Sequence, residues 1–217
     1  DIVEKWKGPI PIVYKKVDVA YPGHARNVGV KFSKGEWIAF IDCRTIPDCD
    51  WLEISASTAE RLGTEFIGAL RTSDADTHFK QILRAATYGS DATKSVAGSI
   101  VLRKVFEQSG GFISDVRAGE DVEWLNRLQS LGVKISWLTS PTIVYYGFVE
   151  SLSEAVKKWS FYAISKSSFE IRNDQKIIYL LILTILLFFL VWKWNAIFAG
   201  WDESSLYYMP NITKIFI

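Results

Sequence analysis

The sequence predicts an α/β domain followed by a membrane segment, and three observations lead to this prediction. Residues 1–147 alternate short apolar runs, typical of buried strands, with amphipathic stretches at helical spacing. Residues 177–192 form an apolar run without any charge. A hydrophobic content of 49% argues against disorder, and a net charge of +1 provides no field that would hold nucleic acid. The chain is therefore expected to fold and to have no nucleic-acid partner.

The first three elements are predicted within residues 11–42. The run PIVYKKV predicts a strand at 11–17. Apolar residues at helical spacing predict a helix at 25–32, and Gly35 supplies its stop signal. The run WIAFID at 37–42 is apolar on both faces, which is typical of a strand buried in a parallel sheet.

The next elements continue the alternation. A helix is expected from Pro47 to Gly63, because proline suits a first helical turn and glycine often ends a helix. The run EFIGALR predicts a strand at 65–71, HFKQILRAATYG predicts a helix at 78–89, and SVAGSIVLR predicts a strand at 95–103.

The last elements of the domain lead toward the apolar run. Apolar residues three apart predict a helix at 119–132 that buries Val122, Leu125, Leu128 and Leu131. The remaining predicted elements are a short helix ending at Gly110 and Gly111, strands at 134–138 and 142–146, and a basic amphipathic helix at 151–168.

Residues 176–201 are predicted to be a transmembrane helix. The run 177–192 would measure roughly 24 Å at about 1.5 Å per residue, against a hydrocarbon core of about 30 Å, but Lys193 can snorkel and apolar sequence resumes up to Trp201. A buried core helix is the alternative. Because more Lys and Arg precede this segment than follow it, the preceding residues are expected to face the cytoplasm.

The predicted organisation has four parts. They are an α/β domain at 1–150, an amphipathic interfacial helix and linker at 151–175, the transmembrane helix at 176–201, and an extracytoplasmic loop with the possible start of a second span at 202–217.

Two acidic positions mark a candidate site. Asp42 ends the strand at 37–42, and α/β folds bind ligands beyond the carboxyl ends of their strands. Glu120 and Asp121 open a helix after a glycine. Taken alone, Asp42 is equally well explained as a turn or cap residue, and the acidic pair as partners of the helix dipole.

The order of three motifs changes this balance. The chain contains ARNVGVKFSKGEWIAFIDC, then a segment ending in GGF, then GED at the start of a helix. This succession, over about residues 10–147, resembles the family 2 glycosyltransferases of GT-A fold. The resemblance implies a GT-A mixed sheet flanked by helices, and an inverting transfer of a sugar from a nucleotide-diphosphate donor to a lipid-linked or polysaccharide acceptor. It also implies a fragment that lacks the N-terminal strand–helix–strand unit of its relatives.

The resemblance assigns roles to individual residues. Asp121 stands at the general base, with Glu120 beside it to position it, and Arg26 and Asp42 stand near the nucleotide. The stretch 98–111, with Gly98, Gly110 and Gly111, stands on the acceptor side, where missing side chains would let backbone amides approach the sugar or the diphosphate. Trp124 is a separate acceptor-side candidate, because its ring could stack on a sugar, and a core position is the alternative.

The sequence departs from its relatives at Arg44, which stands where the D-x-D motif has its second, metal-binding aspartate. Three alternatives follow. Arg44 itself neutralises the donor diphosphate, or Asp42 alone holds Mg²⁺ or Mn²⁺, or the site is impaired. The third alternative would make the chain a catalytically silent GT-A-like module that binds a nucleotide sugar or scaffolds an envelope polysaccharide assembly complex.

Overall fold

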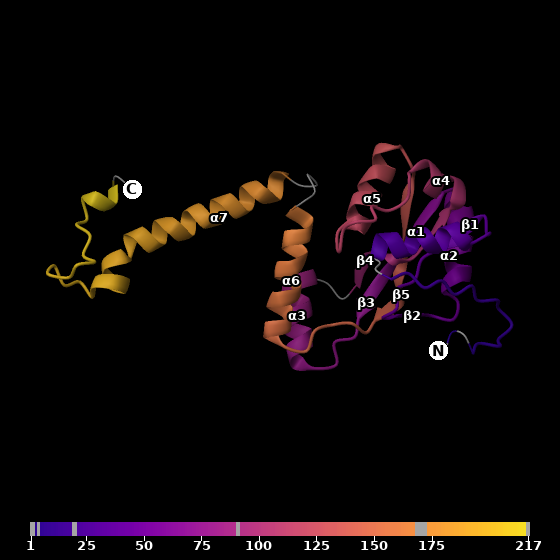
Figure 1. Ribbon diagram of the computed structural model, residues 1–217, viewed down its shortest axis with the longest axis horizontal. Coiled ribbons are helices and arrows are strands. Elements are labelled where there is room, and N and C mark those ends of the chain that lie inside the picture. Colours follow the sequence, from indigo (N-terminus) through magenta and orange to yellow (C-terminus); the bar gives the residue numbers. More distant parts are fainter. Residues whose placement is uncertain (1–2, 4, 19–20, 90–91, 168–172, 216–217) are drawn as a thin grey trace. The chain divides into compact units, whose positions relative to one another are not determined.

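The computed structural model describes the chain except for residues 1–2, 4, 19–20, 90–91, 168–172 and 216–217 (Figure 1). The chain forms two compact units, Asp1–Ser168 and Phe169–Ile217. The first unit holds all the predicted site residues.

The first unit is built on a five-stranded sheet in the order β1-β4-β3-β5-β2. Strands β3 and β5 are parallel, and the other three neighbouring pairs are antiparallel. The strands are β1 (Trp37–Ala39), β2 (Thr45–Pro47), β3 (Phe66–Ser73), β4 (Ala92–Leu102) and β5 (Ile135–Tyr145). The predicted mixed α/β class is confirmed.

Three strand predictions were wrong in part. Residues 11–17 form no strand, because no described strand lies alongside to bond their backbone. The side chain of Val13 in this segment is exposed. The strand expected at 37–42 ends at Ala39, after which Asp42 already belongs to a turn. The two strands expected at 134–138 and 142–146 are one strand, β5, with shifts in its register against β3.

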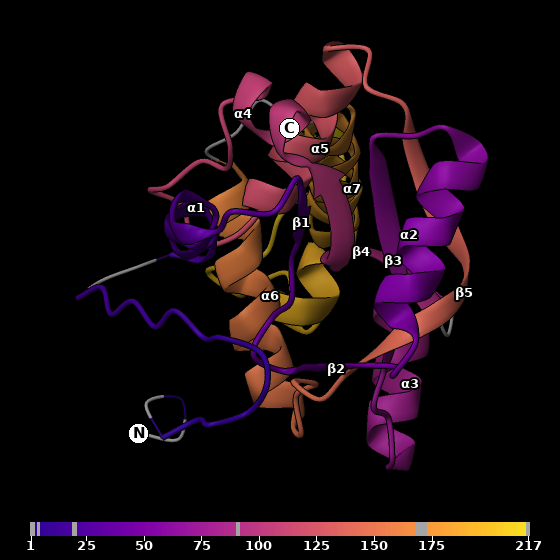
Figure 2. The ribbon, with the colours of Figure 1, turned by 90° about the vertical axis from the view of Figure 1, so that its right-hand side faces the viewer.

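Helices cover both faces of the sheet (Figure 2). Helices α1 (Pro22–Phe32), α4 (Arg103–Gln108) and α5 (Glu120–Ser130) pack on one face, where Phe66 and Val101 point. Helix α2 (Trp51–Leu62) packs on the other face against Ile67 and Ile100. It begins later than expected, because Pro47 pairs with Ile143 in the sheet. Helices α3 (His78–Tyr88) and α6 (Leu152–Ser167) complete the unit.

The larger core cluster is built around Trp124. Its side chain is 0% exposed, and its ring lies 4.4 Å from the Phe112 ring and 5.8 Å from the Phe66 ring, centre to centre. The indole Nε1 donates a hydrogen bond of 2.8 Å to Ser109 Oγ, so the polar edge is also satisfied inside the core. This cluster holds α5 against the sheet, and thereby fixes where the helix begins.

Gly98 allows β4 to pass closely under its neighbours. Its φ is +88°, and a Cβ at this position would overlap Ile143 Cδ1 and lie 2.8 Å from Ala69 Cβ. Gly98→Ala is therefore expected to lower the free energy of unfolding by about 2–5 kcal/mol, through left-handed backbone strain of about 1–2 kcal/mol and overpacking of about 1–3 kcal/mol. Urea unfolding followed by tryptophan fluorescence measures this loss.

Gly29→Ala in α1 is the matched control. A Cβ at Gly29 meets nothing within 4 Å, so the substitution is expected to stabilise the helix by about 0.5–1 kcal/mol. Equal effects of the two substitutions would contradict the close packing at Gly98.

The second unit contains α7 (Asn173–Trp192), a π-helical turn (Asn195–Ala199) and a short 3₁₀ turn (Thr213–Ile215). Within the described residues, no helix combines the length and the apolar character needed to cross a bilayer. The transmembrane helix predicted at 176–201 is therefore not supported. The regular α-helix ends at Trp192, so the expected continuous helix is interrupted before Trp201.

Candidate active site

Three predicted site residues meet at one point of the first unit. Arg26 lies on α1, Asp42 follows β1, and Glu120 is the first residue of α5. Arg26 Nη1 donates to Glu120 Oε1 at 2.7 Å, and Arg26 Nη2 donates to Asp42 Oδ1 at 2.9 Å. The guanidinium also lies over the Phe112 ring, 5.2 Å from its centre. One arginine thus joins both acidic positions of the sequence motifs.

Local hydrogen bonds hold these residues in place. Asn27, next to Arg26, donates from Nδ2 to the Phe112 carbonyl at 2.8 Å and accepts from the Phe112 amide at 2.9 Å. This pair of bonds fixes the GGF loop to α1. In the turn after β1, Thr45 Oγ1 donates to the Asp42 carbonyl at 2.6 Å, which orients the aspartate.

Burial sets the electrostatics of the pair formed by Arg26 and Glu120. Their side chains are 13% and 6% exposed, whereas that of Asp42 is 41% exposed. Burial raises the pKa of Glu120, and the neighbouring charge of Asp121 adds to this effect, while Arg26 opposes it. Burial alone would lower the pKa of Arg26, but the charges and hydrogen bonds of Asp42 and Glu120 outweigh it and raise the pKa. The bonds to Arg26 therefore oppose the effect of burial on the Glu120 carboxyl group.

Asp121 lies next to this network without joining it. Its Oδ1 accepts a hydrogen bond of 2.8 Å from the Val122 amide in the first turn of α5, and its side chain is half-buried. Among the described residues it forms no ion pair. A carboxylate in this position can still accept a proton from a bound hydroxyl group.

Arg44 does not reach the network of Arg26. Its carbonyl accepts from the Tyr146 amide at 2.8 Å, and its side chain packs against Gly147. Two further cations, Arg71 and Lys158, were not identified by the sequence motifs. Burial has the larger effect in lowering the pKa of Lys158, and the charges of Arg44 and Arg71 both lower it further.

The structure contradicts the acceptor-side prediction for Trp124, because this side chain is fully buried and has no surface for a sugar. The backbone amides of the three glycines on the predicted acceptor side donate within the fold. Gly98 donates to the Phe40 carbonyl at 2.6 Å, Gly110 to the Glu107 carbonyl at 3.1 Å, and Gly111 to the Phe106 carbonyl at 3.2 Å. These glycines serve the sheet and the end of α4.

The side chains around Asp42 do not fit a divalent metal. Mg²⁺ and Mn²⁺ prefer several oxygen ligands, but one oxygen of Asp42 is already bonded to Arg26, and a cation, Arg44, follows two residues later. Nowhere in the described part of the chain do three or more His, Cys, Asp or Glu side chains gather as metal ligands would.

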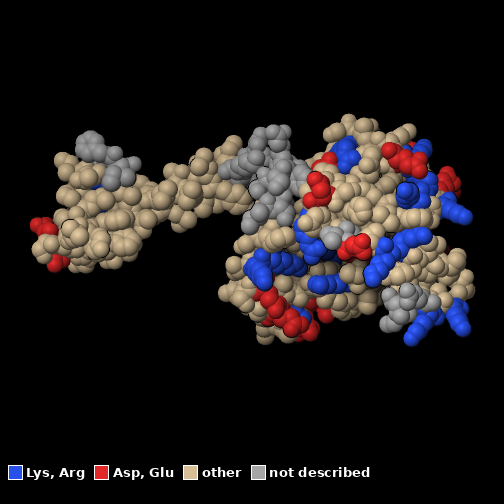
Figure 3. Space-filling model, viewed as in Figure 1, with Lys and Arg blue, Asp and Glu red and all other residues tan. Residues whose placement is uncertain are grey.

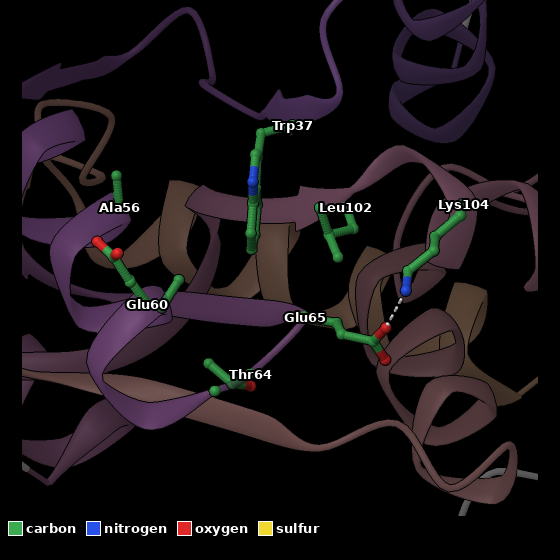
Figure 4. Close-up of a pocket in the computed structure, with 9 residues that line it drawn as sticks. Trp37, Ala56, Glu60, Thr64, Glu65, Leu102 and Lys104 are labelled. Atoms are coloured by element: carbon green, nitrogen blue, oxygen red, sulfur yellow. Dashed lines mark ion pairs between the residues drawn. The ribbon is translucent and has the colours of Figure 1, made fainter.

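A hollow of about 590 Å³ lies elsewhere, between α2 and the β1 edge of the sheet (Figure 4). Trp37, Thr64 and Leu102 line it together with the ion pair of Lys104 and Glu65, whose Nζ and Oε1 are 2.7 Å apart. The described residues that line it include none of the predicted site residues, so it is separate from the candidate site.

Comparisons with known proteins point to sugar transfer. No family model matches the chain. Residues of this chain are 26% identical over 122 residues to the glycosyltransferase AglE of Haloferax volcanii, in a match that covers 52% of this chain and 40% of AglE. The chain thus spans less than half the length of this curated relative.

The structure is similar to that of Staphylococcus aureus TarS (residues 1–349) in complex with UDP-GlcNAc. The TM-score is 0.53 at 14% sequence identity, and the match covers 71% of this chain and 47% of the TarS chain. At this identity the likeness concerns the fold. The chain therefore has a mixed α/β fold that resembles that of a GT-A-like glycosyltransferase.

Proposed function

We propose that the chain is an inverting family 2 glycosyltransferase that moves a sugar from a nucleotide-diphosphate donor to a lipid-linked or polysaccharide acceptor. The observation that carries the proposal is the bridge from Arg26 to Asp42 and Glu120. It joins both ends of the first motif to the third motif, beside the helix start that holds Asp121. The similarity to AglE and the fold shared with TarS support the same activity.

Asp121 is the proposed general base. A sugar hydroxyl is a weak nucleophile at neutral pH, so a carboxylate that takes its proton during attack on the anomeric carbon accelerates transfer. Glu120 is a positioning residue, because its bond to Arg26 fixes the first turn of α5 relative to α1. Arg26 in turn holds Asp42 at the end of β1, where the nucleotide of the donor would lie.

The proposed setting is the cytoplasmic face of a membrane. The support for this setting is the apolar surface of α7, where Leu180, Leu186 and Phe188 are each at least 60% exposed. Exposed apolar surface of this kind marks a site of contact with lipid or protein. A lipid-linked acceptor would be presented at such a surface.

A silent nucleotide-sugar-binding module is the second candidate function. The observation that favours it is Arg44, which replaces a carboxylate that metal-dependent relatives require. Such a module would bind the donor in the same place, but it would release no nucleoside diphosphate.

A donor-cleavage assay separates the two functions. The purified chain is incubated with a panel of nucleotide sugars, with and without isoprenyl-phosphate acceptors in liposomes, and released nucleoside diphosphate is measured by chromatography. We expect release from at least one donor, stimulated by the acceptor. Binding without release would establish the silent module, and a chain that neither binds nor cleaves any donor would refute both functions.

A further inference from the structure

A second group of charged residues lies on the same unit. Arg44 lies between β1 and β2, Arg71 on β3 and Lys158 on α6. We call these three residues the basic cluster. Gly147 connects two of them, because the Arg44 side chain packs against it and Lys158 Nζ donates to its carbonyl at 3.4 Å. Figure 3 shows basic side chains, with acidic ones beside them, on one face of this unit.

Aromatic rings hold the cations in place. The guanidinium of Arg71 lies 4.8 Å from the centre of the Tyr145 ring, and Lys158 Nζ lies 5.6 Å from the same ring. Lys158 also lies 5.9 Å from the centres of the Trp159 and Tyr162 rings. Cations over aromatic faces keep their positive charge while giving up part of their hydration. Arg71 and Lys158 are thus held against the fold, whereas the Arg44 side chain is exposed.

In the part of the chain that the structure describes, no carboxylate pairs with these charges. Within the described residues, none of the three cations forms an ion pair, and Arg71 Nε is buried without a hydrogen-bond partner. An unpaired buried donor is costly, as are like charges held together. Burial lowers the pKa of Lys158, and the charges of Arg44 and Arg71 lower it further. A bound anion would relieve each of these costs.

The basic cluster adjoins the candidate active site. Arg44 follows Asp42 by two residues, and the backbone of this turn is joined to β5 next to the cluster. The turn that holds Asp42 therefore also holds one member of the basic cluster.

We propose that Arg44, Arg71 and Lys158 bind the phosphate oxygens of a substrate and replace the metal ion that the D-x-D motif would hold. The role in catalysis rests on the proposed function. As the acceptor oxygen bonds to the anomeric carbon and its proton passes to Asp121, the bond from that carbon to the diphosphate oxygen breaks. The leaving diphosphate takes the electron pair, and fixed cations stabilise its charge. Arginine forks and ammonium groups bind phosphate oxygens without a metal.

Titration calorimetry with inorganic pyrophosphate in EDTA tests the site directly. Lys158→Met keeps the aliphatic stem and removes the charge, and Arg44→Gln alters an exposed side chain, so both variants should fold. Each is expected to weaken pyrophosphate binding about tenfold, because each removes one charged contact to the phosphate oxygens. Lys157→Met makes the same charge change at an exposed neighbouring residue, and it should change the affinity for pyrophosphate less than twofold.

Two further ligands identify the source of the phosphate. If Lys158→Met weakens the binding of UDP, the cluster binds the leaving nucleotide. If the same variant weakens the binding of geranyl phosphate, the cluster binds a lipid-linked acceptor. Equal pyrophosphate affinity in all variants, or no binding by the native chain, overturns the proposal. Because pyrophosphate binding needs no sugar transfer, a cluster that binds in a chain without transferase activity would refute the proposed function alone.

Discussion

Asp121→Asn is expected to reduce sugar transfer by about 10²- to 10⁴-fold, the range typical of a lost general base, while donor affinity stays within twofold. The amide oxygen of asparagine can still accept the bond from the Val122 amide, so the first turn of α5 should keep its geometry. The loss would therefore come from the missing proton acceptor. Transfer rates at saturating donor, together with donor binding by calorimetry, measure the two quantities separately.

Asp115→Asn is the matched control for this prediction. Asp115 is exposed in the loop that leads to α5, and it carries the same charge a few residues away. Its substitution should leave the rate within twofold. Full transfer by Asp121→Asn, or an equal loss in both variants, would remove Asp121 from the role of base.

The sequence nominated candidate site residues but did not predict how they interact. The motifs nominate Arg26, Asp42 and Glu120 separately, but nothing in their spacing indicates that Arg26 bonds to both carboxylates. Lys158 and Arg71 were missed because each belongs to an ordinary helix or strand pattern. Their significance depends on the shared ring of Tyr145, which only the folded chain brings between them.

The buried face of α5 shows why periodicity alone was insufficient. Apolar spacing predicted that Val122, Leu125, Leu128 and Leu131 point inward. Leu128 is buried and Leu125 packs against the core, but Val122 and Leu131 are exposed. The helix also buries Glu120 and Trp124, which the spacing did not indicate.

Arg26→Met is expected to cost about 3 kcal/mol of the free energy of unfolding and to abolish detectable transfer. Removing one partner of a buried ion pair leaves an uncompensated charge, which typically costs about 3–5 kcal/mol. The lower end applies here, because Asp42 is 41% exposed and water can solvate it, whereas Glu120 is 6% exposed. Urea unfolding measures the loss. Arg61→Met, at an exposed arginine in α2 without a described ion pair, should cost less than 0.5 kcal/mol, as is usual for surface substitutions.

The double variant Arg26→Met, Glu120→Gln separates the structural role of this ion pair from its role at the site. Glutamine has nearly the shape of glutamate without its charge, so the double variant should recover about half of the lost stability, or about 1–2 kcal/mol. Transfer should not recover, because Asp42 would still lack the arginine that holds it at the end of β1. Recovery of both stability and transfer would mean that Arg26 only neutralises Glu120. Recovery of stability alone would show that one side chain both stabilises the fold and arranges the site.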